Sequence, residues 1–95
     1  MGSIDDLDWS IGCNPNFADA YYYRSIGKSE LKDHQGALID SAEAARLNPE
    51  NIHFKIGYAI NFLNIGDRLN AKIELKPLAE SGNLRAIELI QKYSL

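Results

Sequence analysis

A turn marker recurs in this chain at a fixed interval, and that interval limits what the chain can fold into. Asn14-Pro15 returns as Asn48-Pro49, 34 positions later. The residue before a proline avoids the α region, so each Asn-Pro pair predicts the end of a helix. A period of this length in a chain of 95 residues is typical of an array in which one supersecondary unit stacks on the next.

Apolar and turn positions keep the same interval. When residues 18–51 are placed on residues 52–85, the identical pairs are Ile26/Ile60, Asp33/Asp67, Ala37/Ala71, Ile39/Ile73 and Ala45/Ala79. The turn markers and the apolar positions therefore share one register. We predict a repeated helical unit.

The segment ADAYYYRSIGKSELKDHQGALIDSAEAARLNPEN, residues 18–51, resembles the tetratricopeptide repeat family, whose unit is a helix–turn–helix of about 34 residues. The matching positions are the aromatic Tyr21, the turn residues Leu31 and Asp33, the small residues Ala37 and Ala44, and the closing Leu47-Asn48-Pro49. The departures are Arg24, Ser25, Lys28 and Ser41, where the family usually has Leu, Gly, Tyr and a large apolar residue.

The resemblance extends over nearly the whole chain. Residues 1–17 match the second helix of a preceding unit, residues 52–85 match a more diverged unit, and residues 83–95 match a final capping helix. It implies one all-α domain, 1–95, an α-solenoid of antiparallel helix pairs with about six helices in a right-handed stack.

Local signals agree with this division. Ser3 followed by Asp6 is a capping-box-like start for the first helix, whose apolar residues Ile4, Leu7 and Ile11 share one face. Further helices are expected at about 17–31, 34–47, 52–65 and 83–94. Pro77 lies inside the helix after Gly66-Asp67, so we expect a kink or break near residues 73–77.

The segment IHFKIGYAI, residues 52–60, carries two signals. Apolar residues alternate with period 2, which is typical of a strand, yet they also form two stripes with helical spacing. The repeat register favours a helix with neighbours on both sides.

The three consecutive tyrosines at 21–23 fan around a helix, because successive residues turn by about 100°. The resemblance implies that Tyr21 packs inside its unit, Tyr22 lines the concave groove, and Tyr23 packs on the N-terminal helix. The alternative is that all three are partly buried packing residues.

Several classes of function lack support. The net charge of −3 argues against a general nucleic-acid binder, and no apolar run is long enough to span a membrane. No phosphate loop, nucleophile elbow or carboxylate pair is present, so we expect no catalysis and no cofactor. His34 and His53 lack further ligands, so we expect them to be exposed and no metal to bind.

Two residues near the N-terminus are expected to be buried. Cys13, the only cysteine, excludes an internal disulfide and fits a reducing, cytoplasmic location. We predict that Cys13 packs in the interior and that Trp9 contacts the next helix.

The resemblance implies a protein–protein interaction module that holds a peptide or a partner's helix on its concave face. The carboxylate clamp of some relatives is absent, because its positions carry Tyr22, Ile26 and Gly57. The predicted groove residues are Asp19, Tyr22, Ile26, Ser29, Glu30, His53, Ile56, Ile60, Leu63 and Asn64.

A structural role is the alternative. Residues 1–17 lack the first helix of their unit, and Met1-Gly2-Ser3 is typical of an expression-tag remnant, so the chain could be a segment of a longer array. A second copy could also complete it, which predicts weak dimerisation through the first helix.

Overall fold

The structure, a computed structural model, describes residues 4–95, and the regular structure in this range is entirely helical. The helices are α1 (Ile4–Cys13), α2 (Ala18–Glu30), α3 (His34–Leu47), α4 (Ile52–Asn64), α5 (Arg68–Glu80) and α6 (Leu84–Tyr93). The all-α prediction is confirmed. The cap predicted at Ser3 lies outside the described residues.

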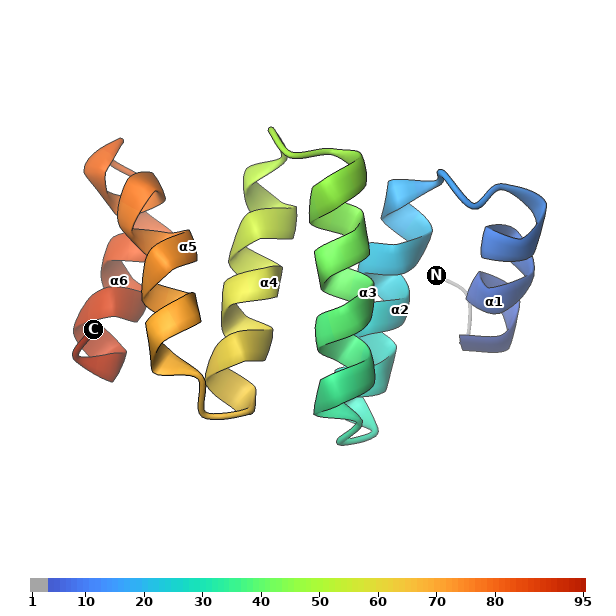
Figure 1. Ribbon diagram of the computed structural model, residues 1–95, viewed down its shortest axis with the longest axis horizontal. Helices are drawn as coiled ribbons and strands as arrows, with labels where there is room; N and C mark the ends of the chain where they lie inside the picture. The colour runs from blue at the N-terminus through green and yellow to red at the C-terminus, as the bar shows by residue number, and fades with distance from the viewer. Residues whose placement is uncertain (1–3) are drawn as a thin grey trace.

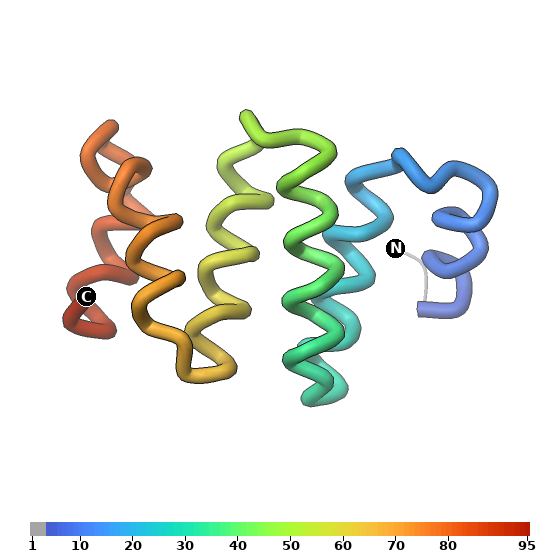
Figure 2. The backbone as a smooth tube through the Cα atoms, in the orientation of Figure 1, coloured from blue at the N-terminus to red at the C-terminus, as the bar shows by residue number. Residues whose placement is uncertain are grey.

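The six helices form a row in which each packs against the next (Figure 1). The molecule measures 39 × 26 × 19 Å, and α1 and α6 lie at opposite ends of its long axis (Figure 2). Helix α2 also contacts α4, the next helix but one. This extra contact brings the first helices of the two units, α2 and α4, together along one side of the row.

Side-chain caps repeat with the register of the units. The carboxylates of Asp33 and Asp67 accept hydrogen bonds of 3.0 and 3.1 Å from the amide three residues on, at the starts of α3 and α5. Asn51 and Asn83 do the same for α4 and α6, at 3.1 and 2.9 Å. The aspartates are 34 residues apart but the asparagines only 32, so α6 begins earlier than a strict repeat would place it.

Small residues let the helices approach closely. Ala20, Ala37, Ala44 and Ala71 are at most 1% exposed. A larger apolar cluster joins the last three helices, and its buried members are Ala59, Leu75, Leu78, Ala86 and Leu89. The last helix supplies two of them, Ala86 and Leu89.

The strand-like alternation at residues 52–60 belongs to α4, as the repeat register predicted. Its buried residues Phe54, Ala59 and Asn61 do not follow period 2. Because α4 contacts α2, α3 and α5, it buries apolar side chains on more than one face.

Pro77 does not break its helix, so the break expected near residues 73–77 is wrong, while a kink there stays a prediction. Helix α5 continues through it to Glu80. Proline removes one backbone donor, the one that would reach Ile73. Pro77 lies in the last turn and on the exposed side, where one missing hydrogen bond is tolerated.

Two predicted burials near the N-terminus are also wrong. Trp9 is 72% exposed, because its register position is an outward-facing one that carries Pro77 in the last unit. Cys13 is exposed at the end of α1. Its equivalent Leu47 is only half-buried, so this position is not part of the core. Leu7 is buried, and Ile4 and Ile11 beside it are half-buried.

No helix within residues 4–95 is both long and apolar enough to cross a lipid bilayer.

Candidate functional site

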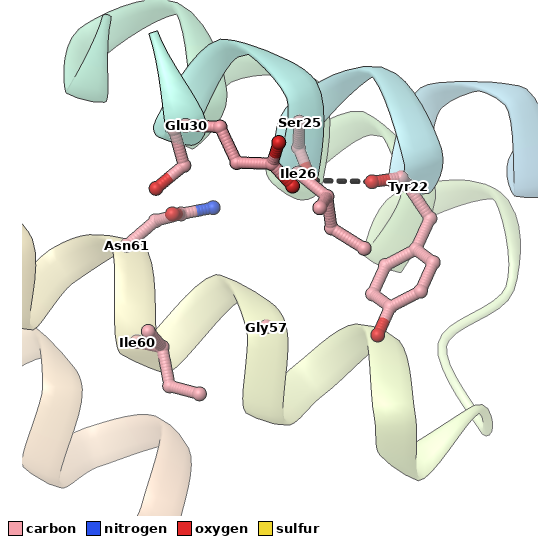
Figure 3. Close-up of a pocket in the computed structure, with 8 residues that line it drawn as sticks. Tyr22, Ser25, Ile26, Glu30, Gly57, Ile60 and Asn61 are labelled. Atoms are coloured by element: carbon pink, nitrogen blue, oxygen red, sulfur yellow. Dashed lines mark hydrogen bonds between the residues drawn. The ribbon is translucent and has the colours of Figure 1, made fainter. Parts of the chain in front are cut away.

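A hollow of about 380 Å³ lies between α2 and α4 (Figure 3). Both helices contribute to its wall, and the lining is mainly apolar. The lining residues are Tyr22, Ser25, Ile26, Ser29, Glu30, Gly57, Ile60 and Asn61. In the close-up, Tyr22 and Ile26 extend from α2 toward the space above α4.

The ring of Tyr22 closes one end of this hollow. It lies 5.0 Å from the ring of Phe54, centre to centre, and against Gly57. A Cβ atom at position 57 would be 3.1 Å from Cε1 of the tyrosine. Glycine at position 57 therefore gives the Tyr22 ring the room to lie on α4.

Two polar side chains in the wall, Ser25 and Asn61, have hydrogen-bond partners within the protein. The hydroxyl of Ser25 donates to the carbonyl of Tyr22 at 2.6 Å. The buried amide of Asn61 donates to the hydroxyl of Ser41 at 2.9 Å and to the carbonyl of Ala37 at 3.2 Å. A buried amide without partners would be costly. Here it connects α4 to α3 and leaves its donors occupied.

A second hollow, of about 430 Å³, continues from the first toward the start of α6. Its lining residues are Tyr22, Ile52, His53, Ile56, Gly57, Ile60, Asn83 and Arg85. Tyr22, Gly57 and Ile60 belong to both hollows. We call the two together the groove. It runs from α2 across α4 to the start of α6.

Most of the predicted groove residues line it. Those that do are Tyr22, Ile26, Ser29, Glu30, His53, Ile56 and Ile60. Asp19 lines a different hollow beside α1, and Leu63 and Asn64, at the C-terminal end of α4, line neither part of the groove. Whether these residues bind a partner stays a prediction.

Sequence reasoning missed several lining residues, namely Ser25, Ile52, Gly57, Asn61, Asn83 and Arg85. Two of them left a signal. Asn61 is a single amide in the apolar run of α4, and Gly57 is a glycine in the middle of a helix, where it costs stability unless close packing needs it. Arg85 could not be found this way, because it comes from a helix outside the repeat register.

The three tyrosines of α2 are all half-buried. Tyr22 lines the groove, as the register predicted, and Tyr23 lines the hollow beside α1, so its predicted packing on the N-terminal helix stays a prediction. Tyr21 lies under the guanidinium of Arg24, 5.6 Å from it, rather than in the fully buried core. The packing alternative therefore describes all three, and only Tyr22 also lines the groove.

An ion cluster behind α2 explains two departures from the family pattern. The carboxylate of Asp40, 2% exposed, accepts hydrogen bonds of 2.8 and 2.7 Å from Arg24. It also forms an ion pair of 3.1 Å with Lys28. Arg24 also reaches Asp8 on α1, at 2.7 Å. The hydrogen bond with Asp40 raises the pKa of Arg24 further above its ordinary value, against the effect of burial. The cluster joins three helices and turns away from the groove.

The histidines offer no metal site. Among residues 4–95, no three His, Cys, Asp or Glu side chains come together in a way that could hold an ion. His53 is exposed in the groove. His34 is half-buried at the start of α3, not exposed as predicted, and its Nδ1 atom is buried without a hydrogen-bond partner.

Comparisons with known proteins identify a fold. No model of a known protein family matches the sequence, and no curated protein matches it. A solved structure does: the crystal structure of MamA protein superposes with a TM-score of 0.73 at 25% sequence identity. The match covers 97% of this chain and 48% of that chain, so this chain spans about half the length of MamA. MamA contains tetratricopeptide repeats, and the present fold is an all-α helical repeat similar to that structure.

Proposed function

We propose that this protein is an interaction module without catalytic activity, and that the groove holds an amphipathic helix or an apolar segment of a partner protein. The observation that carries the proposal is the pair of adjoining, mainly apolar hollows along α2 and α4, which share Tyr22, Gly57 and Ile60. The likeness to MamA supports an interaction fold of the helical-repeat type.

The groove has the composition that suits a helix with one apolar face. Tyr22, Ile26, Ile56 and Ile60 supply apolar surface, and Ile26 is 39% exposed although it is a large aliphatic residue. A contiguous apolar surface of this kind commonly marks an interaction site. Tyr22 is the expected anchor, because aromatic side chains in the centre of an interface contribute most to binding.

The ends of the groove differ in charge. Glu30 lies at the α2 end, and His53 and Arg85 line the other end. Arg85 is already paired with Glu88, so Glu30 is the charge that can orient a partner. A partner helix would therefore bind more tightly with a cation near Glu30.

The test uses the double variant Tyr22→Ala with Ile60→Glu. Binding of a labelled amphipathic helical peptide with a leucine face is followed by fluorescence anisotropy. We expect the variant to keep its helical circular dichroism and to bind at least about tenfold more weakly, a loss of about 1.4 kcal/mol. The variant lacks the aromatic side chain of Tyr22, and the glutamate at position 60 places a charge against the apolar face of the peptide.

The matched control is Ile39→Glu on α3. Ile39 is 68% exposed and does not line the groove. The same apolar-to-acidic change there should leave binding unaltered. If the double variant unfolds, Tyr22 and Ile60 are needed for the fold, and the groove is not an open binding surface. If it folds and binds normally, the site lies elsewhere.

A further inference from the structure

The first hollow of the groove, between α2 and α4, contains an amide oxygen that the fold leaves without a partner. Asn61 lines this hollow and is 5% exposed. Its amide nitrogen donates to the carbonyl of Ala37 and to the hydroxyl of Ser41, both on α3. Because a carbonyl can only accept, these bonds fix the orientation of the amide, with its nitrogen toward α3. The remaining polar atom of the side chain is the acceptor Oδ1.

This oxygen is open to a ligand. Among residues 4–95, Oδ1 of Asn61 has no hydrogen-bond partner. It is not sealed from solvent either, since within that range the one side-chain nitrogen or oxygen that is both sealed and unpartnered is Nδ1 of His34. The open surface at Asn61 is the first hollow, which it lines. Buried polar groups normally have a hydrogen-bond partner, so an open acceptor on a buried side chain points to a donor from outside the chain.

Two further side chains add acceptors to the same hollow. Ser29 and Glu30, from the last turn of α2, line it together with Asn61. Within the described part of the chain, neither side chain makes a hydrogen bond or an ion pair. Figure 3 shows Glu30 and Asn61 at one end of the hollow and Tyr22 at the other. No basic residue lines this hollow, so the end away from Tyr22 offers acceptors and one negative charge.

Apolar side chains lie next to these acceptors. Ile60 precedes Asn61 in α4, and Ile26 lies one turn before Glu30 on the same face of α2. A side chain that fits therefore has an apolar stem and a positively charged donor at its tip. Lysine has both, because its ammonium only donates hydrogen bonds and its stem consists of methylene groups. Arginine fits less well, since its planar guanidinium matches two oxygens of one carboxylate, whereas these acceptors belong to separate side chains.

We propose that the first hollow is a subsite for one lysine of the partner protein, whose ammonium donates to Oδ1 of Asn61 and to the carboxylate of Glu30. The stem of the lysine packs on Ile26 and Ile60. This inference rests on the proposed function of the groove, because the lysine belongs to the helix or apolar segment bound there. It adds a residue type that the partner must carry, and it makes Asn61 a determinant of specificity.

The probes are labelled amphipathic peptides with a leucine face, each carrying one lysine beside that face. The lysine stands at a different position in each peptide, so the set samples the spacing between lysine and leucines. In the peptide that binds most tightly, norleucine and trimethyllysine then replace the lysine. Norleucine keeps an apolar stem without the charge, and trimethyllysine keeps the charge without an N–H donor.

The two replacements separate the charge from the hydrogen bond. We expect the parent chain to bind the lysine peptide at least about fivefold more tightly than the norleucine peptide. The trimethyllysine peptide should bind at least about threefold more weakly than the lysine peptide, because it cannot donate to Asn61. Raised salt should narrow the first difference, since Glu30 is exposed.

The decisive variant is Glu30→Gln, which removes the charge and keeps the shape of the side chain. It should lower the preference for lysine over norleucine at least about threefold and leave the affinity for the norleucine peptide unchanged. The matched control is Glu80→Gln. Glu80 is also exposed and also the last residue of its helix, α5, but it does not line the groove. This control should keep the parent preference.

A second variant, Asn61→Leu, tests the amide oxygen. If its circular dichroism stays helical, it should bind the lysine and trimethyllysine peptides equally. If it unfolds through the loss of its bonds to α3, the comparison of these two peptides on the parent chain carries the test.

Other outcomes overturn the inference. Equal binding of the lysine and norleucine peptides by the parent chain removes the lysine subsite, while the groove stays supported if Tyr22→Ala with Ile60→Glu weakens both. Equal binding of the lysine and trimethyllysine peptides shows that Asn61 accepts no hydrogen bond from the partner. An unchanged preference in the Glu30→Gln chain places the lysine elsewhere. If the parent chain binds none of the peptides, both the proposed function and this inference are wrong.

Discussion

The two complete units, residues 18–51 and 52–85, share a framework but fill its interior with different chemistry. Arg24 and Lys28, both half-buried, form an ion cluster with the buried Asp40 in the first unit. At the same three positions of the second unit stand Tyr58, Phe62 and Glu74. There, the rings of Tyr58 and Phe62 pack 4.6 Å apart, centre to centre.

A second pair of equivalent positions shows the same contrast between a polar and an apolar side chain. Ser41 in the first unit is fully buried and accepts a hydrogen bond from Asn61. Its equivalent in the second unit is Leu75, also fully buried, at the centre of the apolar cluster. The helix pair therefore tolerates either a polar network or an apolar core next to the same buried alanines, Ala37 in the first unit and Ala71 in the second.

The difference bears on where stability comes from. Buried apolar side chains stabilise a fold directly, whereas a buried ion pair repays little more than the desolvation of its charges. Removing one member of a buried ion pair lowers the unfolding free energy much more, because the remaining charge is left buried without a partner. The first unit should thus be sensitive to the loss of a carboxylate and the second should not.

The largest expected effect comes from Asp40→Ala. Arg24 keeps its pair with Asp8, and both cations are partly exposed, so we expect a loss of about 2–3 kcal/mol of unfolding free energy, below the range for a fully buried pair. Glu74→Ala changes the same position in the second unit, where Glu74 is half-buried. It should cost less than about 1 kcal/mol. Urea denaturation of both variants measures the difference, and equal losses would show that the ion cluster has no special role.

The turns inside the two units make the next comparison. Lys32 has φ of 67°, and Gly66, 34 positions later, has φ of 81°. In both turns the following aspartate amide donates to the carbonyl five residues earlier, at 2.8 and 2.9 Å. The backbone conformation is thus the same, but only glycine adopts it without strain.

Exchanging the residues should move stability in opposite directions. Lys32→Gly is expected to raise the unfolding free energy by a few tenths of a kcal/mol up to about 1 kcal/mol. The relief of backbone strain in the folded state outweighs the opposing effect of glycine, which gives the unfolded chain more freedom. Gly66→Ala should lower it by about 1 kcal/mol. Nothing lies within 4 Å of the added Cβ, so a clash would not contribute. Thermal unfolding of the two variants tests this, and a destabilised Lys32→Gly chain would contradict it.

The sequence was sufficient for the framework because caps, turns and small residues act locally. Asp33 and Asp67 mark the starts of second helices, and the Asn-Pro pairs mark helix ends. Each of these signals depends on a few neighbouring residues. Together they placed four helices, at about 17–31, 34–47, 52–65 and 83–94, within one residue at each end.

Burial at single positions was harder to predict, since it depends on which side of a helix faces a neighbour. Trp9 is apolar and yet exposed, because its register position faces outward. Asp40 is charged and yet buried, because two cations on another helix meet it. The lining of the groove was predicted along α2 and α4 but not at Arg85, whose helix is out of register.

The smallest expected effect is a pH dependence confined to the second unit. Burial, and to a lesser extent the charge of Glu74, raise the pKa of Tyr58 above its ordinary value. A group whose pKa is higher in the folded state stabilises the fold fully below its unfolded pKa, about 10 for tyrosine, and this contribution is lost as the pH rises through the folded value. The first unit behaves differently at the same position, since Arg24 keeps its charge throughout this range.

Tyr58→Phe should therefore change stability little at pH 7 and should lessen the fall in the urea midpoint above about pH 10. The matched control is Tyr93→Phe on α6, the same side-chain change at another half-buried tyrosine, and the effect of Tyr58→Phe is measured against it. An equal fall in the parent and Tyr58→Phe chains would assign the alkaline loss to other groups.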